Sequence, residues 1–128
     1  MNGLRTSLLA AAALLLFVGA VGNAFIIVPD LHGDLIEIGV RRSVLLPTVY
    51  ALYGNVMTGF AFAVIVSAAA FESARGRSLP MIALAAIAVV VFVEGVMRFS
   101  QSHNPHHFAP IAMGLLIAGA LLVPRPSR

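Results

Sequence analysis

The residues of this chain that could do chemistry gather in one polar stretch between two long apolar runs. The stretch extends from Glu94 to His107 and holds the only acidic residue inside an apolar run, together with three of the four histidines. Glu94 precedes Arg98 by four residues, the order that favours an ion pair along a helix. If the apolar run crosses a membrane, an ionisable group within it costs about 2.5–3.5 kcal/mol and commonly faces the bundle interior or water. Two interpretations stay open: a structural ion pair at a helix end, or a proton carrier, metal ligand or substrate anchor.

The histidines of this stretch are side chains that metal ions favour, but their spacing matches no known metal motif. The candidate ligands are His103, His106 and His107, with His32 from elsewhere in the chain, and a metal site needs three or four ligands that converge. His106 and His107 are adjacent, and a proline separates them from His103. Amphipathic side chains resting at the level of lipid headgroups explain the pair equally well. We therefore predict no cofactor and keep a metal ion as the weaker alternative.

The composition is that of an integral membrane protein. Of the 128 residues, 60% are hydrophobic and 10% are charged, and the mean hydropathy is +0.99, whereas globular chains carry about a quarter charged residues. The absence of cysteine excludes disulfides, thiolate metal sites and covalent c-type haem. The net charge of +3 comes from arginines scattered between apolar runs, without the basic face or arm of a nucleic-acid-binding protein. We expect one domain that contacts the lipid bilayer and binds no nucleic acid.

The apolar runs predict an all-α fold of four transmembrane helices, at about residues 7–28, 47–70, 80–99 and 105–123. Each is close to the roughly 20 residues that cross the hydrocarbon core, and the short connections favour an antiparallel up-down bundle. Residues 30–42 carry acidic and apolar positions at helical spacing, typical of a short amphipathic segment in the membrane interface. The start of the chain also resembles a secretory signal with a cut after Ala24, but its apolar run is longer than a signal core.

The arginines predict how the chain lies in the membrane. An even number of spans puts both termini on one side, and that side carries five of the eight arginines: Arg5, Arg75, Arg77, Arg125 and Arg128. The opposite side carries Arg41, Arg42 and Arg98, together with all four histidines. Because cytoplasmic loops are enriched in arginine and lysine, we expect cytoplasmic termini and a location in a plasma membrane or a bacterial-type inner membrane.

Polar side chains from all four helices are expected at a similar depth on the histidine side. At 1.5 Å per residue, Asn23 and Glu94 lie roughly 8 Å inside their helix ends and Asn55 lies roughly 12 Å inside. Asn104 and Pro105 are typical of the cap and first residue of a helix, which places the adjacent histidines in the first turn of the last span. The candidate ligand pocket therefore consists of Asn23, Asn55, Glu94, Arg98, His106 and His107.

Small residues recur where the helices must approach one another. Helices in lipid associate through close backbone contact, because no hydrophobic force drives them together. The residues that would allow such contact are Gly19, Gly22, Gly54, Gly59, Gly114 and Gly119, with the alanine-rich run 83–88. They indicate helix packing within the bundle.

Two functions of different class fit these observations. No phosphate-binding loop, nucleophile elbow or dinucleotide-binding glycine pattern is present, so the sequence leaves open whether the chain is an enzyme. The short loops and small-residue faces favour a non-catalytic subunit or scaffold that packs against other membrane subunits, or against copies of itself, in a larger complex. The alternative is a small membrane enzyme or binding protein that uses the polar pocket on a lipophilic ligand, with or without a metal ion.

Overall fold

The structure, a computed structural model, describes residues 2–124, and this part of the chain contains helices and turns but no strand. Four helical stretches within it are long and apolar enough to cross a membrane, which confirms the predicted all-α, four-span fold. Arg125 and Arg128, which the orientation argument counts, lie outside the described residues. The elements are α1 (Asn2–Gly22), the π-helical segment η1 (Asn23–Ile27), α2 (Val28–Glu37), α3 (Arg42–Ala74), α4 (Met81–Ser102), the 3₁₀ turn η2 (Pro105–His107) and α5 (Phe108–Leu122).

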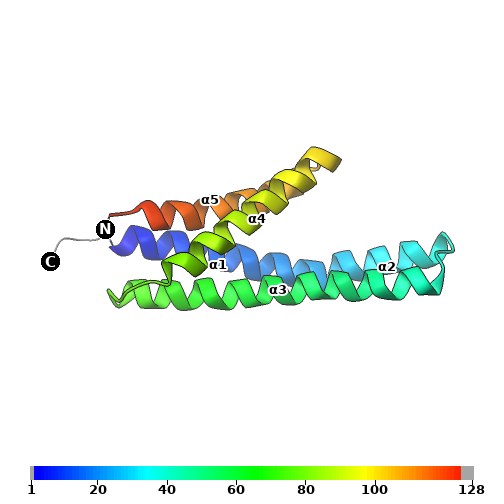
Figure 1. Cartoon of the computed structure of the whole chain (residues 1–128), viewed down its shortest axis with the longest axis horizontal. Coiled ribbons are helices and arrows are strands. Elements are labelled where there is room, and N and C mark those ends of the chain that lie inside the picture. Colours follow the sequence, from blue (N-terminus) through cyan, green and yellow to red (C-terminus); the bar gives the residue numbers. More distant parts are fainter. Residues whose placement is uncertain (1, 125–128) are drawn as a thin grey trace.

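The first span is longer than predicted. The elements α1, η1 and α2 follow one another without a break, so the helix continues through the acidic segment as far as Glu37 (Figure 1). The segment predicted as a separate interfacial helix is thus the continuation of the first span. Packing along α3 explains this: Val28 is buried, and His32 and Leu35 on the same helical face are half-buried. The start of α3 is also earlier than predicted, at Arg42, and places Pro47 inside the helix.

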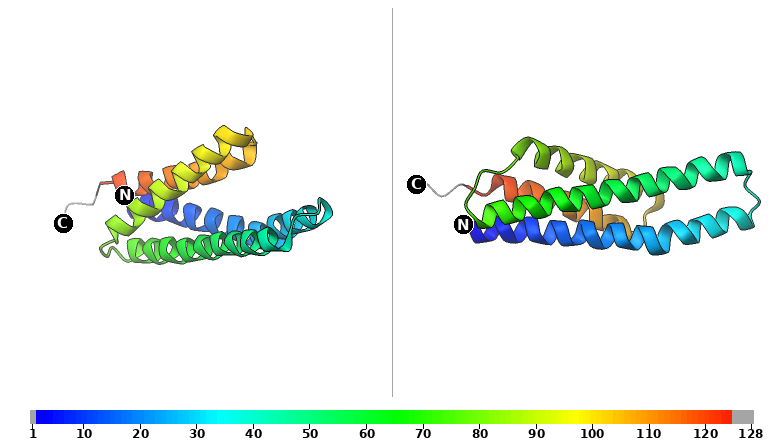
Figure 2. Two further views of the ribbon diagram at one scale, coloured as in Figure 1. Left: turned by 45° about the vertical axis from the view of Figure 1, so that its right-hand side comes forward. Right: turned by 90° about the horizontal axis from the view of Figure 1, so that it is seen from below.

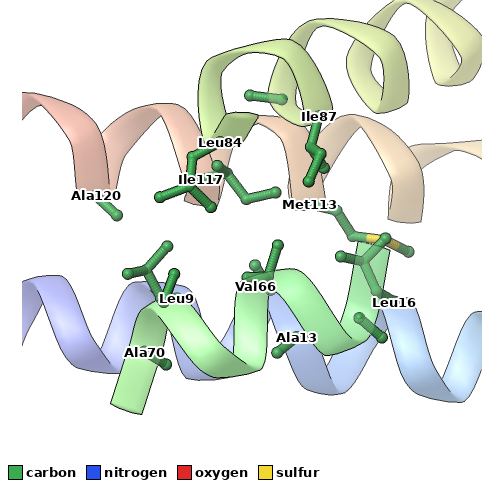
Figure 3. Packing of buried hydrophobic residues seen from close by; sticks show 14 of the residues in the cluster. Leu9, Ala13, Leu16, Val66, Ala70, Leu84, Ile87, Met113, Ile117 and Ala120 are labelled. Carbon is green, nitrogen blue, oxygen red and sulfur yellow. The ribbon is translucent and has the colours of Figure 1, made fainter. Parts of the chain in front are cut away.

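The helices pack in the spatial order α3, α1, α5, α4. Helix α1 lies against both α3 and α5, and α4 packs along α5. In the half of the molecule that holds the termini, side chains from all four helices meet in one core (Figure 3). Leu9 of α1, Val66 of α3, Leu84 of α4 and Ile117 of α5 are fully buried there. We call this the terminal half.

The opposite half, which contains the turn at residues 38–41 and all four histidines, is open, and we call it the histidine half. There the α4–α5 hairpin points away from the hairpin of α2 and α3 (Figure 1 and Figure 2). We call α1, η1, α2 and α3 the first hairpin; within residues 2–124, none of its helices packs along α4. The bundle is therefore closed around a core at one end and divergent at the other.

Glycine lets α4 and α5 approach each other closely. A Cβ atom added at Gly114 would lie 2.7 Å from the Cβ of Phe92 and 2.8 Å from the carbonyl oxygen of Ala88. A Cβ atom added at Gly95 would lie 2.8 Å from the backbone nitrogen of Ile111. These separations are too short for any side chain, so the α4–α5 contact requires glycine at both positions.

The predicted packing glycines divide into two groups. Gly59 lies against Ala20 of α1, with 3.3 Å between an added Cβ and that of the alanine, so it takes part in the α1–α3 contact as expected. Gly22 and Gly54 meet nothing within 4 Å in the described part of the chain. Gly95, which makes one of the closest contacts, was not among the predicted positions.

Candidate functional site

The predicted ion pair between Glu94 and Arg98 forms in the histidine half. Nη2 of Arg98 contacts Oε1 of Glu94 one turn away on α4. The side chain of Glu94 is 45% exposed and that of Arg98 is 44% exposed. An ion pair with this exposure contributes about 0.2–1 kcal/mol when water surrounds it. Its main effect is therefore to fix the orientation of the two charges.

Both charges continue the core-facing side of α4 into the region where the hairpins diverge. Glu94 follows Ile87 by two helical turns, and Arg98 follows Val91 by two turns, so each pair shares a face of the helix. Ile87 and Val91 are buried in the core. Glu94 also borders a shallow apolar groove on the outer side of α4, which places its carboxylate at the edge of the core-facing side.

The two asparagines hold equivalent positions on the first hairpin. Asn23, the first residue of η1, follows the buried Leu16 of α1 by about two turns, and Asn55 precedes Phe62 of α3 by two turns. Phe62 packs against the core. The side chain of Asn23 donates a hydrogen bond from Nδ2 to the carbonyl oxygen of Gly19, at 2.9 Å, whereas Asn55 is exposed. Both asparagines therefore lie on the inner sides of their helices, beyond the level at which the core closes.

The first span changes its helix type at Asn23, where η1 begins. Two residues account for the change. Pro29 cannot donate a backbone hydrogen bond and its ring crowds the carbonyl group of Phe25 in the preceding turn. The side-chain amide of Asn23 donates to the carbonyl oxygen of Gly19, and so competes with a backbone N–H for this acceptor. A π-helical turn of this kind is often found at functional positions in helices.

These polar side chains share a depth but are not joined. Within residues 2–124 no hydrogen bond or salt bridge links either Asn23 or Asn55 to Glu94 or Arg98. The reason is the divergence of the hairpins. The residues lie at a similar depth along their own helices, but in the histidine half α4 is separated from α1 and α3. A single pocket that contains all six candidate residues stays a prediction.

The turn between α4 and α5 has the predicted cap. Oδ1 of Asn104 accepts a hydrogen bond from the backbone N–H of His106 at 3.0 Å, and Pro105 is the first residue of η2. The first turn is 3₁₀ rather than α, so α5 itself begins at Phe108. His106 is exposed, and His107 is half-buried.

His103 has a structural part in the same turn. It ends α4 in the left-handed conformation, with φ of 52°, which costs about 1–2 kcal/mol for a residue other than glycine. Its ring lies 5.8 Å from that of Phe99, which in turn lies 4.6 Å from the ring of Phe108. The aromatic contacts across the turn help to hold this strained conformation in place.

The histidines are not gathered into one site. His32 is half-buried on α2, which packs along α3, whereas His103, His106 and His107 lie at the junction of α4 and α5. In the part of the chain that the structure describes, no three histidine, aspartate or glutamate side chains could share a metal ion. What the histidine half offers to a partner or ligand is an oriented ion pair, two amides and exposed imidazole rings.

The structure gives Arg5 a role that the sequence analysis missed. Arg5 is 7% exposed, its Nε donates to the carbonyl oxygen of Ala120 at 3.1 Å, and its Nη2 donates to that of Val123. The cation thus pairs with the carbonyl groups at the C-terminal end of α5, where the helix dipole favours positive charge. A signal was present in the sequence: Arg5 precedes Leu9 and Ala12 by one and two turns, on the buried face of α1.

No protein-family model, no curated protein and no solved structure matches this chain. The assignment of a function therefore rests on the residues of the chain and on their geometry.

Proposed function

We propose that this chain is a non-catalytic subunit of a larger membrane complex and that its histidine half receives a transmembrane helix of another subunit. The observation that carries the proposal is the divergence of the two hairpins. The helices share a core in the terminal half only, while α4 and α3 separate toward the histidine end (Figure 1). A helix from a partner that enters this region would extend the core along the rest of the bundle.

The side chains on the inner sides of the diverging helices support this proposal. Asn55 is exposed, and Glu94 and Arg98 are about half exposed, although each lies on the face that is buried in the terminal half. Polar groups at membrane depth need partners inside a protein or in water. A partner helix with a hydrogen-bonding side chain would supply them, with roughly 0.6 kcal/mol gained for an average interhelical hydrogen bond.

The second candidate function is the binding of a lipophilic ligand in the same region. It is favoured by the Glu94–Arg98 pair, because two oriented charges at the core-facing side of α4 could hold the polar end of such a ligand. The two functions differ in what must occupy the histidine half: a stoichiometric protein partner in the first case and a small molecule in the second.

Purification from mild detergent distinguishes the two functions. We expect the tagged chain to bring down a membrane protein in fixed ratio, and we expect Asn55→Trp to lose that protein because the indole fills the inner side of α3. Met57→Trp is the matched control, since Met57 lies on the opposite, outward face of the same helix and is 68% exposed. A wild-type chain that purifies alone, or a partner that both variants retain equally, would contradict the subunit proposal.

A further inference from the structure

An apolar groove on the terminal half lies outside the region discussed so far. It runs between α1 and α3 and has a volume of about 690 Å³. Its walls include Ala10, Leu14 and Phe17 from α1, and Val64, Ser67 and Phe71 from α3. Leu14, Val64 and Phe71 are more than half exposed, so the groove opens to the surroundings of the bundle and not to its core.

The length of the groove matches one leaflet of a bilayer. It begins at Thr6 and Ala74, near one end of the hairpin, and ends at Phe17 and Ala63. At 1.5 Å per residue, the eleven steps from Thr6 to Phe17 span roughly 16 Å. This is about half of the roughly 30 Å hydrocarbon core. With Thr6 and Ala74 at the membrane surface, where the predicted first and second spans end, the groove extends to about the bilayer centre.

A cation stands at the surface end of this groove. The guanidinium carbon of Arg75 lies 4.0 Å above the ring centre of Phe71, a groove residue. The other arginine of this turn, Arg77, is paired with Glu72. Arg75 forms no salt bridge with any residue from 2 to 124. Stacking on an aromatic ring leaves the N–H groups of a guanidinium free to donate, and their fork matches the oxygens of a phosphate.

We propose that the groove binds an anionic phospholipid, with one acyl chain between α1 and α3 and the phosphate on Arg75. The apolar walls of the groove, which are as long as one leaflet, match the acyl chain of such a lipid. Arg75, at the surface end, matches the phosphate of its headgroup. Basic sites between transmembrane helices are a common way to hold acidic lipid headgroups. The site lies at the opposite end from the histidine half and does not depend on the proposed subunit function.

Charge also argues against a second copy of the chain in this groove. A symmetric dimer uses the same surface of both subunits. With both chains inserted in the same direction, it would bring the two Arg75 side chains to the same level, and the acid of this turn, Glu72, is already paired with Arg77. A lipid phosphate instead supplies the opposite charge.

Native mass spectrometry of the detergent-solubilised chain tests the proposal, with phosphatidylglycerol and phosphatidylcholine of identical acyl chains as probes. We expect one bound phosphatidylglycerol in preference to phosphatidylcholine. The variant Arg75→Gln should weaken phosphatidylglycerol binding about fivefold, since one arginine near an acidic headgroup contributes about that factor. The matched control is Arg42→Gln, which removes the same charge at the other end of α3 and should leave binding unchanged.

A second variant tests the groove itself. Ala10 is exposed and lines the groove, so Ala10→Leu should fill it and reduce the binding of both lipids. Equal binding of the two lipids to the wild-type chain, unchanged phosphatidylglycerol binding in Arg75→Gln, or unchanged lipid binding in Ala10→Leu would each overturn the proposal. So would efficient disulfide dimerisation of Ser67→Cys in membranes, because a second copy would then occupy the groove.

Discussion

The close contact of α4 with α5 predicts a large cost for a single methyl group at Gly114. An added Cβ would lie 2.7 Å from the Cβ of Phe92 and 2.8 Å from the carbonyl oxygen of Ala88, while ordinary contact begins at 3.4 Å. The two helices must therefore separate by 3.4 − 2.7 = 0.7 Å at this point. One of the clashing atoms belongs to the backbone, so no side-chain rotation can relieve the contact. Overpacking of this kind typically costs about 1–3 kcal/mol.

Gly119→Ala is the matched control on the same helix. Among residues 2–124, an added Cβ at Gly119 meets only Leu8 Cδ1, at 3.8 Å, which is an ordinary contact. Alanine also favours the helix by up to about 1 kcal/mol over glycine. We expect Gly114→Ala to lower the free energy of unfolding in mixed micelles, measured by titration with a denaturing detergent and far-UV circular dichroism, and Gly119→Ala to leave it unchanged or raise it. Equal stability of the two variants would refute the close α4–α5 contact.

Three further predictions concern single side chains and orientation. Arg5→Gln should destabilise the chain by about 1–3 kcal/mol in the same titration, because it leaves buried carbonyl groups at the end of α5 without their charged donor; wild-type stability would contradict the contact. His103→Gly should keep or raise stability, by up to about 1 kcal/mol, since glycine adopts the left-handed conformation without strain; a clear loss would mean that the imidazole itself holds the turn. Cysteines introduced at Ser78 and Ser102, both exposed, should react from opposite sides of the membrane, with Ser102 accessible from outside; labelling of both from one side would remove the four-span topology.

The apolar runs alone were enough to predict the four helices, because nothing but helix satisfies the backbone in lipid at this length. Their ends were harder to predict. The charges of residues 30–42 predict a segment separate from the first span, because they obscure the shared helical face of Val28, His32 and Leu35, along which the helix continues beside α3. Helix ends depend on such tertiary contacts, which composition does not reveal.

In the candidate site, too, the sequence predicts local features but not those that depend on how the helices pack. The Glu94–Arg98 pair and the Asn104 cap follow from local spacing, and both form. Whether the asparagines meet that pair depends on the angle between two hairpins, which no local pattern encodes. Arg5 was counted only as a charge that orients the chain, because a lone arginine near a helix start resembles a topological signal. Its contact with α5 arises from two segments at opposite ends of the sequence.

The claim that the histidine half is an interface can be tested most directly in intact membranes. A photoreactive amino acid placed at Asn55, on the inner side of α3, is compared with the same amino acid at Met57, on the outward side. The proposal predicts that Asn55 forms an adduct of one discrete mass with a protein, while Met57 reacts with lipid. Reaction of both positions with lipid alone would contradict it and leave the histidine half without a protein partner.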